Sequence, residues 1–187
     1  MRRGAAARPV VVALLALGTL AACSDDSPDK GEATLKVDGV ATVVRQDGDR
    51  EKVTRRTDMR IGDAVTLVSG SGTLDLGGGA SLVLREGLGD RADSKVVMGP
   101  VPALEAGDVL ATTDDQMVLS ADGTRLRIVA GSVRASRSTG MGVAAYDGDV
   151  ELDSAGQQRT VPALREMSVP ALGRPPAAPR PLDYNPS

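Results

Sequence analysis

The chain contains no histidine, tryptophan or phenylalanine, and it has one cysteine and two tyrosines among its 187 residues. Without histidine, Ser-His-Asp and Cys-His catalysis and histidine-based metal sites are excluded. Because the large aromatic side chains are nearly absent, the core must consist of aliphatic side chains and methionine. Aromatic platforms are nearly absent, which weakens any glycan-binding role that depends on ring stacking.

Long apolar runs are also absent, apart from one short run near the N-terminus. Arg2, Arg3 and Arg8 precede an apolar stretch of about 13 residues from Val10 to Ala22, which is shorter than the roughly 20 residues that a helix needs to cross a bilayer. A charged segment, an apolar segment and small residues, in that order, are typical of a secretory signal. We predict that residues 1–22 are a signal peptide that is removed on export.

The signal ends in Leu20-Ala21-Ala22-Cys23, which resembles the lipobox of bacterial lipoproteins. This resemblance implies a diacylglycerol on the Cys23 thiol, and two or more acyl chains hold a protein stably on a membrane. The alternative is an ordinary signal peptide with an incidental cysteine. A lone cysteine cannot form an internal disulfide, which favours lipidation and a location on the extracytoplasmic face of the cell membrane.

Negative charge exceeds positive charge in the part that follows the signal. The whole chain has a net charge of −3, and loss of Arg2, Arg3 and Arg8 with the signal makes the remainder more acidic. Nucleic-acid binding usually requires a strongly basic surface, so we expect no nucleic-acid partner. We also expect no cofactor.

The rest of the chain divides by composition. Residues 23–33 are polar and are expected to form a tether to the lipid. Residues 34–169 contain short apolar or alternating runs separated by Gly and Asp, and an offset of about 45 residues relates the stretch after Gly62 to the stretch after Gly107. We predict two similar units, about 34–95 and 96–169, that share one core. Residues 170–187 are rich in proline and are expected to be a spacer or tail.

The pattern of residues 34–169 predicts an all-β sandwich or roll of many short antiparallel strands, with disordered termini. Four Asp-Gly dipeptides support this prediction because they tolerate the backbone of tight hairpin turns. They are Asp38-Gly39, Asp47-Gly48, Asp122-Gly123 and Asp147-Gly148.

The order of Gly-Asp, a short strand, Gly-x-x-Leu and a Gly-x-Val strand resembles the FecR-type domain of bacterial envelope proteins. The matching stretches run from Ile61 to Leu84, from Ala106 to Val133 and from Tyr146 to Glu151. The resemblance implies an extracytoplasmic β domain that relays a signal through protein contacts without catalysis. In the best-known members a membrane helix joins this domain to a cytoplasmic segment that acts on a sigma factor. Here a lipobox signal occupies that place, so we expect the signal to pass through a second membrane protein.

An acidic run from Asp147 to Asp153 has carboxylates at every second position, which brings a calcium site to mind. The helix-loop-helix calcium loop requires Gly at its sixth place and Glu at its twelfth, but Leu152 and Gln158 stand there. We interpret the run as an exposed acidic strand face opposite buried Val150 and Leu152. No metal site is predicted.

A basic feature precedes the acidic run. Arg125, Arg127, Arg134 and Arg137 lie in a stretch without acidic residues, from Arg125 to Tyr146. We hypothesise that they contact an anionic partner, either an acidic protein surface or a wall polymer. The alternative is a solvated face balanced by the acidic strand.

No catalytic residues are assigned, and we predict that the chain is not an enzyme. The leading hypothesis is a lipid-anchored, FecR-like binding or signal-relay module with an envelope protein partner. One alternative is a wall-active hydrolase that uses a pair of carboxylates, since such a pair needs only spatial proximity. The other is a purely structural envelope spacer.

Overall fold

The computed structural model describes residues 33–87, 92–170 and 176–183. These residues form twelve strands and no helix, so the all-β prediction is confirmed, and no helix in the described ranges is long and apolar enough to span a membrane. The strands are β1 (Ala33–Val44), β2 (Arg50–Val53), β3 (Arg56–Met59), β4 (Ala64–Gly77), β5 (Ala80–Arg85), β6 (Lys95–Val97), β7 (Ala103–Ala121), β8 (Thr124–Arg137), β9 (Met141–Ser154), β10 (Gln157–Val161), β11 (Arg165–Val169) and β12 (Arg180–Pro181).

Antiparallel pairing joins these strands into one sheet in the order β12-β11-β9-β8-β7-β5-β4-β1-β2. Three strands lie off this path: β10 pairs with β9, β3 with β1, and β6 with both β4 and β7. Most of the strands are short, as predicted, and four are long. β7 has 19 residues, and β4, β8 and β9 have 14 each.

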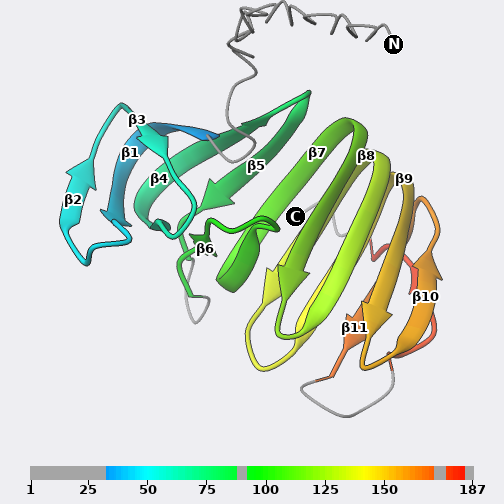
Figure 1. Ribbon diagram of the computed structural model, residues 1–187. Coiled ribbons are helices and arrows are strands. Elements are labelled where there is room, and N and C mark those ends of the chain that lie inside the picture. The colour runs from blue at the N-terminus through cyan, green and yellow to red at the C-terminus, as the bar shows by residue number, and fades with distance from the viewer. Residues whose placement is uncertain (1–32, 88–91, 171–175, 184–187) are drawn as a thin grey trace, which may run out of the picture.

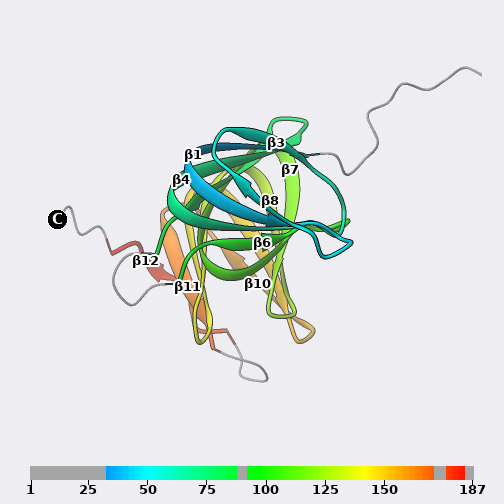
Figure 2. The same cartoon turned by 90° about the vertical axis from the view of Figure 1, so that its left-hand side faces the viewer.

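The long strands bend in the middle, so that each forms an arch with two limbs. The Ser120 N–H near the end of β7 donates to the carbonyl of Pro102, the residue before β7, at 2.9 Å. Figure 1 shows β7, β8 and β9 as neighbouring arches, and Figure 2 shows the strands surrounding a common interior. The sheet is thus a folded roll, because the bends turn one layer back onto itself.

Paired glycines allow the strands to bend. A Cβ at Gly39 would lie 2.2 Å from the Ser69 carbonyl oxygen, and one at Gly70 would lie 2.1 Å from that of Asp38. Gly131 and Gly148 form the equivalent crossing between β8 and β9, where an added Cβ would lie 2.0 Å from a facing carbonyl oxygen in each case. Both crossings bring two backbones closer than any side chain permits.

These crossings correct part of the turn prediction. Asp38-Gly39 lies inside β1 and Asp147-Gly148 inside β9, so both are bends within strands rather than hairpin turns. Asp122-Gly123 does connect β7 to β8, and Asp47-Gly48 lies in the loop between β1 and β2. Hairpin turns and bends within strands both require a positive φ angle here, so the Asp-Gly dipeptide alone does not distinguish one from the other.

The interior of the roll is filled by Val, Leu, Ile, Met and Ala side chains that form one cluster. The largest fully buried side chains come from nearly every long strand and include Leu35, Leu67, Leu84, Leu119 and Ile128. Burial at every second position along each limb, as in β1, reflects the alternation of side chains in a strand. The aliphatic core expected from the composition is present.

The repeat offset of about 45 residues recurs in the structure. The glycine-rich turn between β4 and β5 begins at Gly77, and the turn between β7 and β8 contains Asp122, 45 positions later. All elements nevertheless share one sheet, since β5 and β6 each pair with strands of both predicted units. The division at residues 95 and 96 stays a prediction.

Buried Ser94 lies at the junction of the predicted units. Its single hydroxyl proton is shared between the Arg85 and Asp108 carbonyls, and its oxygen accepts from the Arg85 N–H, while the Ser94 carbonyl accepts from the Leu67 N–H. A Cβ at Gly107 would lie 2.6 Å from the Ser94 backbone, so the close approach requires glycine there. One hydroxyl thus joins β5 to β7.

Candidate functional site

The predicted lipidation site, Cys23, lies outside the described residues, as do the signal peptide and the tether up to residue 32. Lipid attachment therefore stays a prediction. The four predicted partner-binding arginines all lie on β8 and are described.

The structure separates these arginines into two pairs, because β8 bends between them at Gly131. Arg125 and Arg127 line a cavity on one limb, whereas Arg134 and Arg137 line another cavity on the second limb. A single continuous patch of four arginines does not form.

On the first limb, Arg127 is engaged with neighbouring strands. Its guanidinium lies 2.7 Å from the Glu151 carboxylate and donates to the Gln116 side-chain oxygen at 3.0 Å. Arg125 is exposed and lies opposite Asp153 in the β8–β9 register. Among the described residues, Arg125 has no ion pair, so it is the member of the predicted set whose charge is available for an anionic partner.

On the second limb, both arginines have carboxylate partners. Arg134 lies 2.7 Å from Asp108, and this hydrogen bond raises the pKa of the Arg134 guanidinium against the opposing effect of burial. Arg137 lies 3.2 Å from Asp122 and donates to the Leu104 carbonyl at 3.4 Å. These pairs are partly exposed, and each is expected to contribute only modestly to stability.

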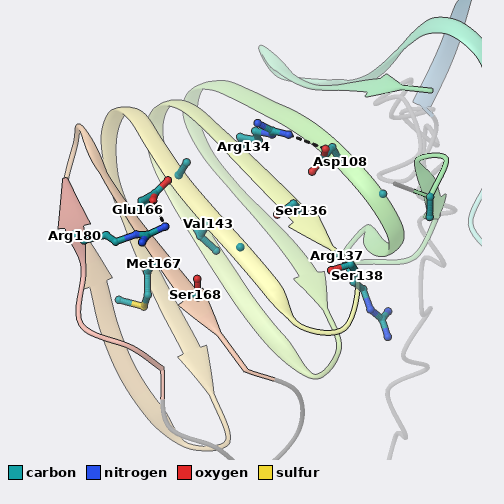
Figure 3. Close-up of a pocket in the computed structure, with 14 residues that line it drawn as sticks. Asp108, Arg134, Ser136, Arg137, Ser138, Val143, Glu166, Met167, Ser168 and Arg180 are labelled. Carbon is teal, nitrogen blue, oxygen red and sulfur yellow. Dashed lines mark hydrogen bonds and ion pairs between the residues drawn. The ribbon is translucent and has the colours of Figure 1, made fainter. Parts of the chain in front are cut away.

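A groove with a cavity volume of about 440 Å³ crosses this second limb (Figure 3). Its floor is made of small residues, since Ser136, Gly142 and Ser168 lie opposite one another on β8, β9 and β11. A second cross-strand row contains Arg134, Ala144 and Glu166, and it continues to Arg180 on β12. The small side chains leave space between the larger charged ones.

Two ion pairs flank the groove (Figure 3): Arg134 with Asp108, and Arg180 with Glu166. Arg180 Nη2 lies 2.6 Å from Glu166 Oε1, but the approach does not satisfy hydrogen-bond geometry, and this buried oxygen has no aligned donor among the described residues. The short distance between the two groups shows an electrostatic contact. The poor alignment of the donor means that the carboxylate oxygen Glu166 Oε1 can still accept a hydrogen bond. The groove lining thus combines three arginines with the Asp108 and Glu166 carboxylates.

Sequence reasoning missed Asp108, Glu166 and Arg180. Asp108 belongs to the recognised Gly-Asp repeat, which was the one available signal. Arg180 lies in the proline-rich tail that was expected to be a spacer, yet residues 176–183 lie along β11 and include the edge strand β12. Proline is compatible with this edge position because its missing N–H would point away from β11, so no hydrogen bond between the strands is lost.

A second cavity lies at the far end of the sheet around Arg45, which contacts Asp63 at 2.9 Å. Asp63 is 2% exposed, and its carboxylate also accepts from the Gln46 and Arg60 N–H groups. Burial alone would raise the pKa of Asp63, but the hydrogen bonds from Arg60, Arg45 and Gln46 outweigh it and lower the pKa. This arrangement holds the carboxylate ionised, which is suited to joining strands and unsuited to a general acid.

The acidic run lies on β9, where Asp149, Glu151 and Asp153 are exposed while Val150 and Leu152 are buried. The interpretation as an acidic strand face is confirmed. In the described part of the chain, no group of three or more carboxylate or cysteine side chains is arranged to hold a metal ion.

Comparison with known proteins gives a likeness of fold. No protein-family model and no curated protein sequence matches the chain. A solved structure of a proposed anti-sigma factor from Parabacteroides distasonis is similar with a TM-score of 0.50 at 12% identity, over 64% of this chain and 61% of that one. Another structure of a proposed anti-sigma factor from the same organism has a TM-score of 0.46 at 10% identity, over 64% and 56% of the two chains. The chain thus shares its β architecture with the first of these proteins.

Proposed function

We propose that the chain is a lipid-anchored, non-enzymatic binding module of the bacterial envelope that relays a signal through protein contacts, with a FecR-like β domain. The observation on which this proposal depends is the form of the second limb. An aliphatic core fills the roll, and the outer surface presents a groove lined by small and charged side chains. Charged side chains on such a surface can provide the specificity and register of a contact with another protein.

Two further observations support this role. The fold resembles that of a proposed anti-sigma factor, a class of protein whose role is regulation. The Leu20-Ala21-Ala22-Cys23 signal would hold the domain near the membrane, where a second membrane protein is within reach. The carboxylate-hydrolase alternative gains no support at Asp63, because the low pKa of this buried carboxyl opposes proton donation.

Site-specific photo-crosslinking in cells tests the proposal. A photoreactive amino acid is introduced at Ser168 in the groove or at Arg125 on the other limb, and exposed Lys52 on β2 provides the control position. We expect one envelope protein to be recovered by mass spectrometry from position 168 or 125 and not from position 52. Recovery of the same abundant proteins from all three positions would contradict a defined partner and favour a structural spacer.

A further inference from the structure

The outer edge of β11 is only partly occupied. On its inner side β11 pairs with β9 from Arg165 to Val169, but on its outer side it pairs with β12 at Arg165 and Glu166 alone. Two hydrogen bonds extend the contact: the Ala177 N–H donates to Ser168 and the Leu182 N–H to Leu164. The segment of residues 176–183, which we name the strap, is thus held by few backbone bonds.

The strap's charged contact is also incomplete. The Arg180 side chain is 70% exposed and reaches the Glu166 carboxylate, which is 23% exposed. Glu166 Oε1 is buried and lacks an aligned donor among the described residues. A buried acceptor without a proper hydrogen bond is unfavourable, so a better-placed cationic donor would bind more strongly than Arg180 does.

Space for a larger occupant lies next to this edge. The groove described above is lined by Arg180, Glu166 and Ser168 (Figure 3). Gly142 lies opposite Ser168 on β9 and has no side chain to fill the groove. Side chains that project from a strand added to β11 would enter this groove, since Glu166 and Ser168 lie along it. Edge pairing supplies affinity, and the groove supplies selectivity.

We propose that β11 is a docking edge for an extended segment of a partner protein, which places a lysine or arginine opposite Glu166 and displaces the strap. The strap itself shows which chemistry the edge accepts: an extended backbone with a basic side chain at the Glu166 position. A partner strand without proline could pair along all five residues of β11, whereas the strap pairs at two. This inference identifies the contact surface of the binding module proposed above.

Charge reversal of the strap provides the test. In the full chain purified in detergent, Arg180→Glu places like charges opposite each other at Glu166. Arg159→Glu makes the same change on exposed β10 and is the matched control. Amide hydrogen exchange at Ala177 and Leu182 reports whether the strap is released. We expect both rates to rise at least tenfold in Arg180→Glu and to stay unchanged in Arg159→Glu.

Occupancy is measured with a dye-labelled synthetic peptide that has the sequence of residues 176–183. It should bind the Arg180→Glu chain at least tenfold more tightly than the unmodified chain, since the edge is then open. A peptide with Glu in place of the arginine should not bind, and adding Glu166→Gln to the protein should abolish binding of the original peptide.

Unchanged exchange in Arg180→Glu would overturn the proposal, as would a released strap with no gain in peptide binding. Dimerisation of Arg180→Glu through exchanged straps would assign the edge to a second copy and likewise overturn it. These outcomes are separate from the crosslinking result, because the peptide experiment requires no native partner.

Discussion

Arg137 Nη2 lies 3.2 Å from Asp122 Oδ1, although Asp122 precedes β8 and Arg137 is its last residue. In a straight strand these positions would be roughly 50 Å apart. The ion pair therefore joins the two ends of one arch. Arg137 also donates to the carbonyl of Leu104 near the start of β7, so it connects neighbouring arches at their open side.

The first prediction concerns this pair. Arg137→Gln and Asp122→Asn should each lower the free energy of unfolding, with a coupling energy of about 0.5–1 kcal/mol in a double-mutant cycle, because both side chains are partly exposed. Asn is chosen because it tolerates the positive φ of position 122. Urea unfolding measures the coupling energy at low and at high salt, and we expect a smaller coupling energy at high salt. If the effects of the two substitutions are additive at low salt, the ion pair does not contribute to closing the arch.

The second prediction concerns the bend between β8 and β9. Gly148→Ala should lower the free energy of unfolding by about 3 kcal/mol or more, because the new Cβ would lie 2.0 Å from the Ala130 carbonyl oxygen. Gly123→Ala is the control: its φ is +74°, against +75° at Gly148, but no atom lies within 4 Å of an added Cβ. It should cost only about 1 kcal/mol. Thermal unfolding compares the two variants. Equal losses of stability in both would show that φ alone determines the requirement for glycine.

The third prediction is a dependence of stability on pH. The pKa of Asp63 is lowered in the folded state, so the ionised carboxylate stabilises the fold above its unfolded pKa of about 4 and this contribution is lost as pH falls through the folded pKa. Asp63→Asn should cost about 3 kcal/mol at pH 7, because Arg45 and two N–H groups lose a buried anion. The difference in the free energy of unfolding between the unmodified chain and Asp63→Asn should become smaller as the pH falls. Denaturant unfolding from pH 7 to pH 2 measures it, and a constant deficit would assign the effect to packing.

The fourth prediction separates the arginines by their contacts. If an anionic partner binds β8, Arg125→Gln should weaken capture without loss of stability, since Arg125 has no ion pair among the described residues. Arg134→Gln should instead lower stability as well, because the ion pair between Arg134 and Asp108 is lost. Pull-down of the crosslinked partner and thermal unfolding are compared for both variants. Full capture by a variant with all four arginines replaced by Gln would reject the patch.

The fifth prediction concerns the anchor. Cys23→Ser should abolish incorporation of labelled fatty acid and shift the protein from the membrane fraction to the soluble fraction, because no other cysteine is present. A Ser24→Ala chain is the control and should stay in the membrane fraction. Membrane retention of Cys23→Ser would indicate an anchor other than lipid at this position.

Local features could be predicted from sequence because they depend on neighbouring residues. Alternating apolar positions indicated strands, as in Val150 and Leu152, and Asp122-Gly123 marked a real hairpin. The sites could not be predicted in the same way. Arg180 contacts Glu166 only because β12 and β11 pair in one particular register, and nothing near Arg180 in the sequence indicates that register.

The sequence by itself determined the all-β class, the aliphatic interior and the predicted lipid signal, since composition and short-range periodicity suffice for each. Only the tertiary structure decided that Asp147-Gly148 is a bend and that the arginines of β8 point to two surfaces. A positive φ is a local property, but whether a chain turns back or bends depends on the backbone that crosses it, which here is Ala130 and Gly131. That crossing folds the sheet and places the groove on one limb of the roll.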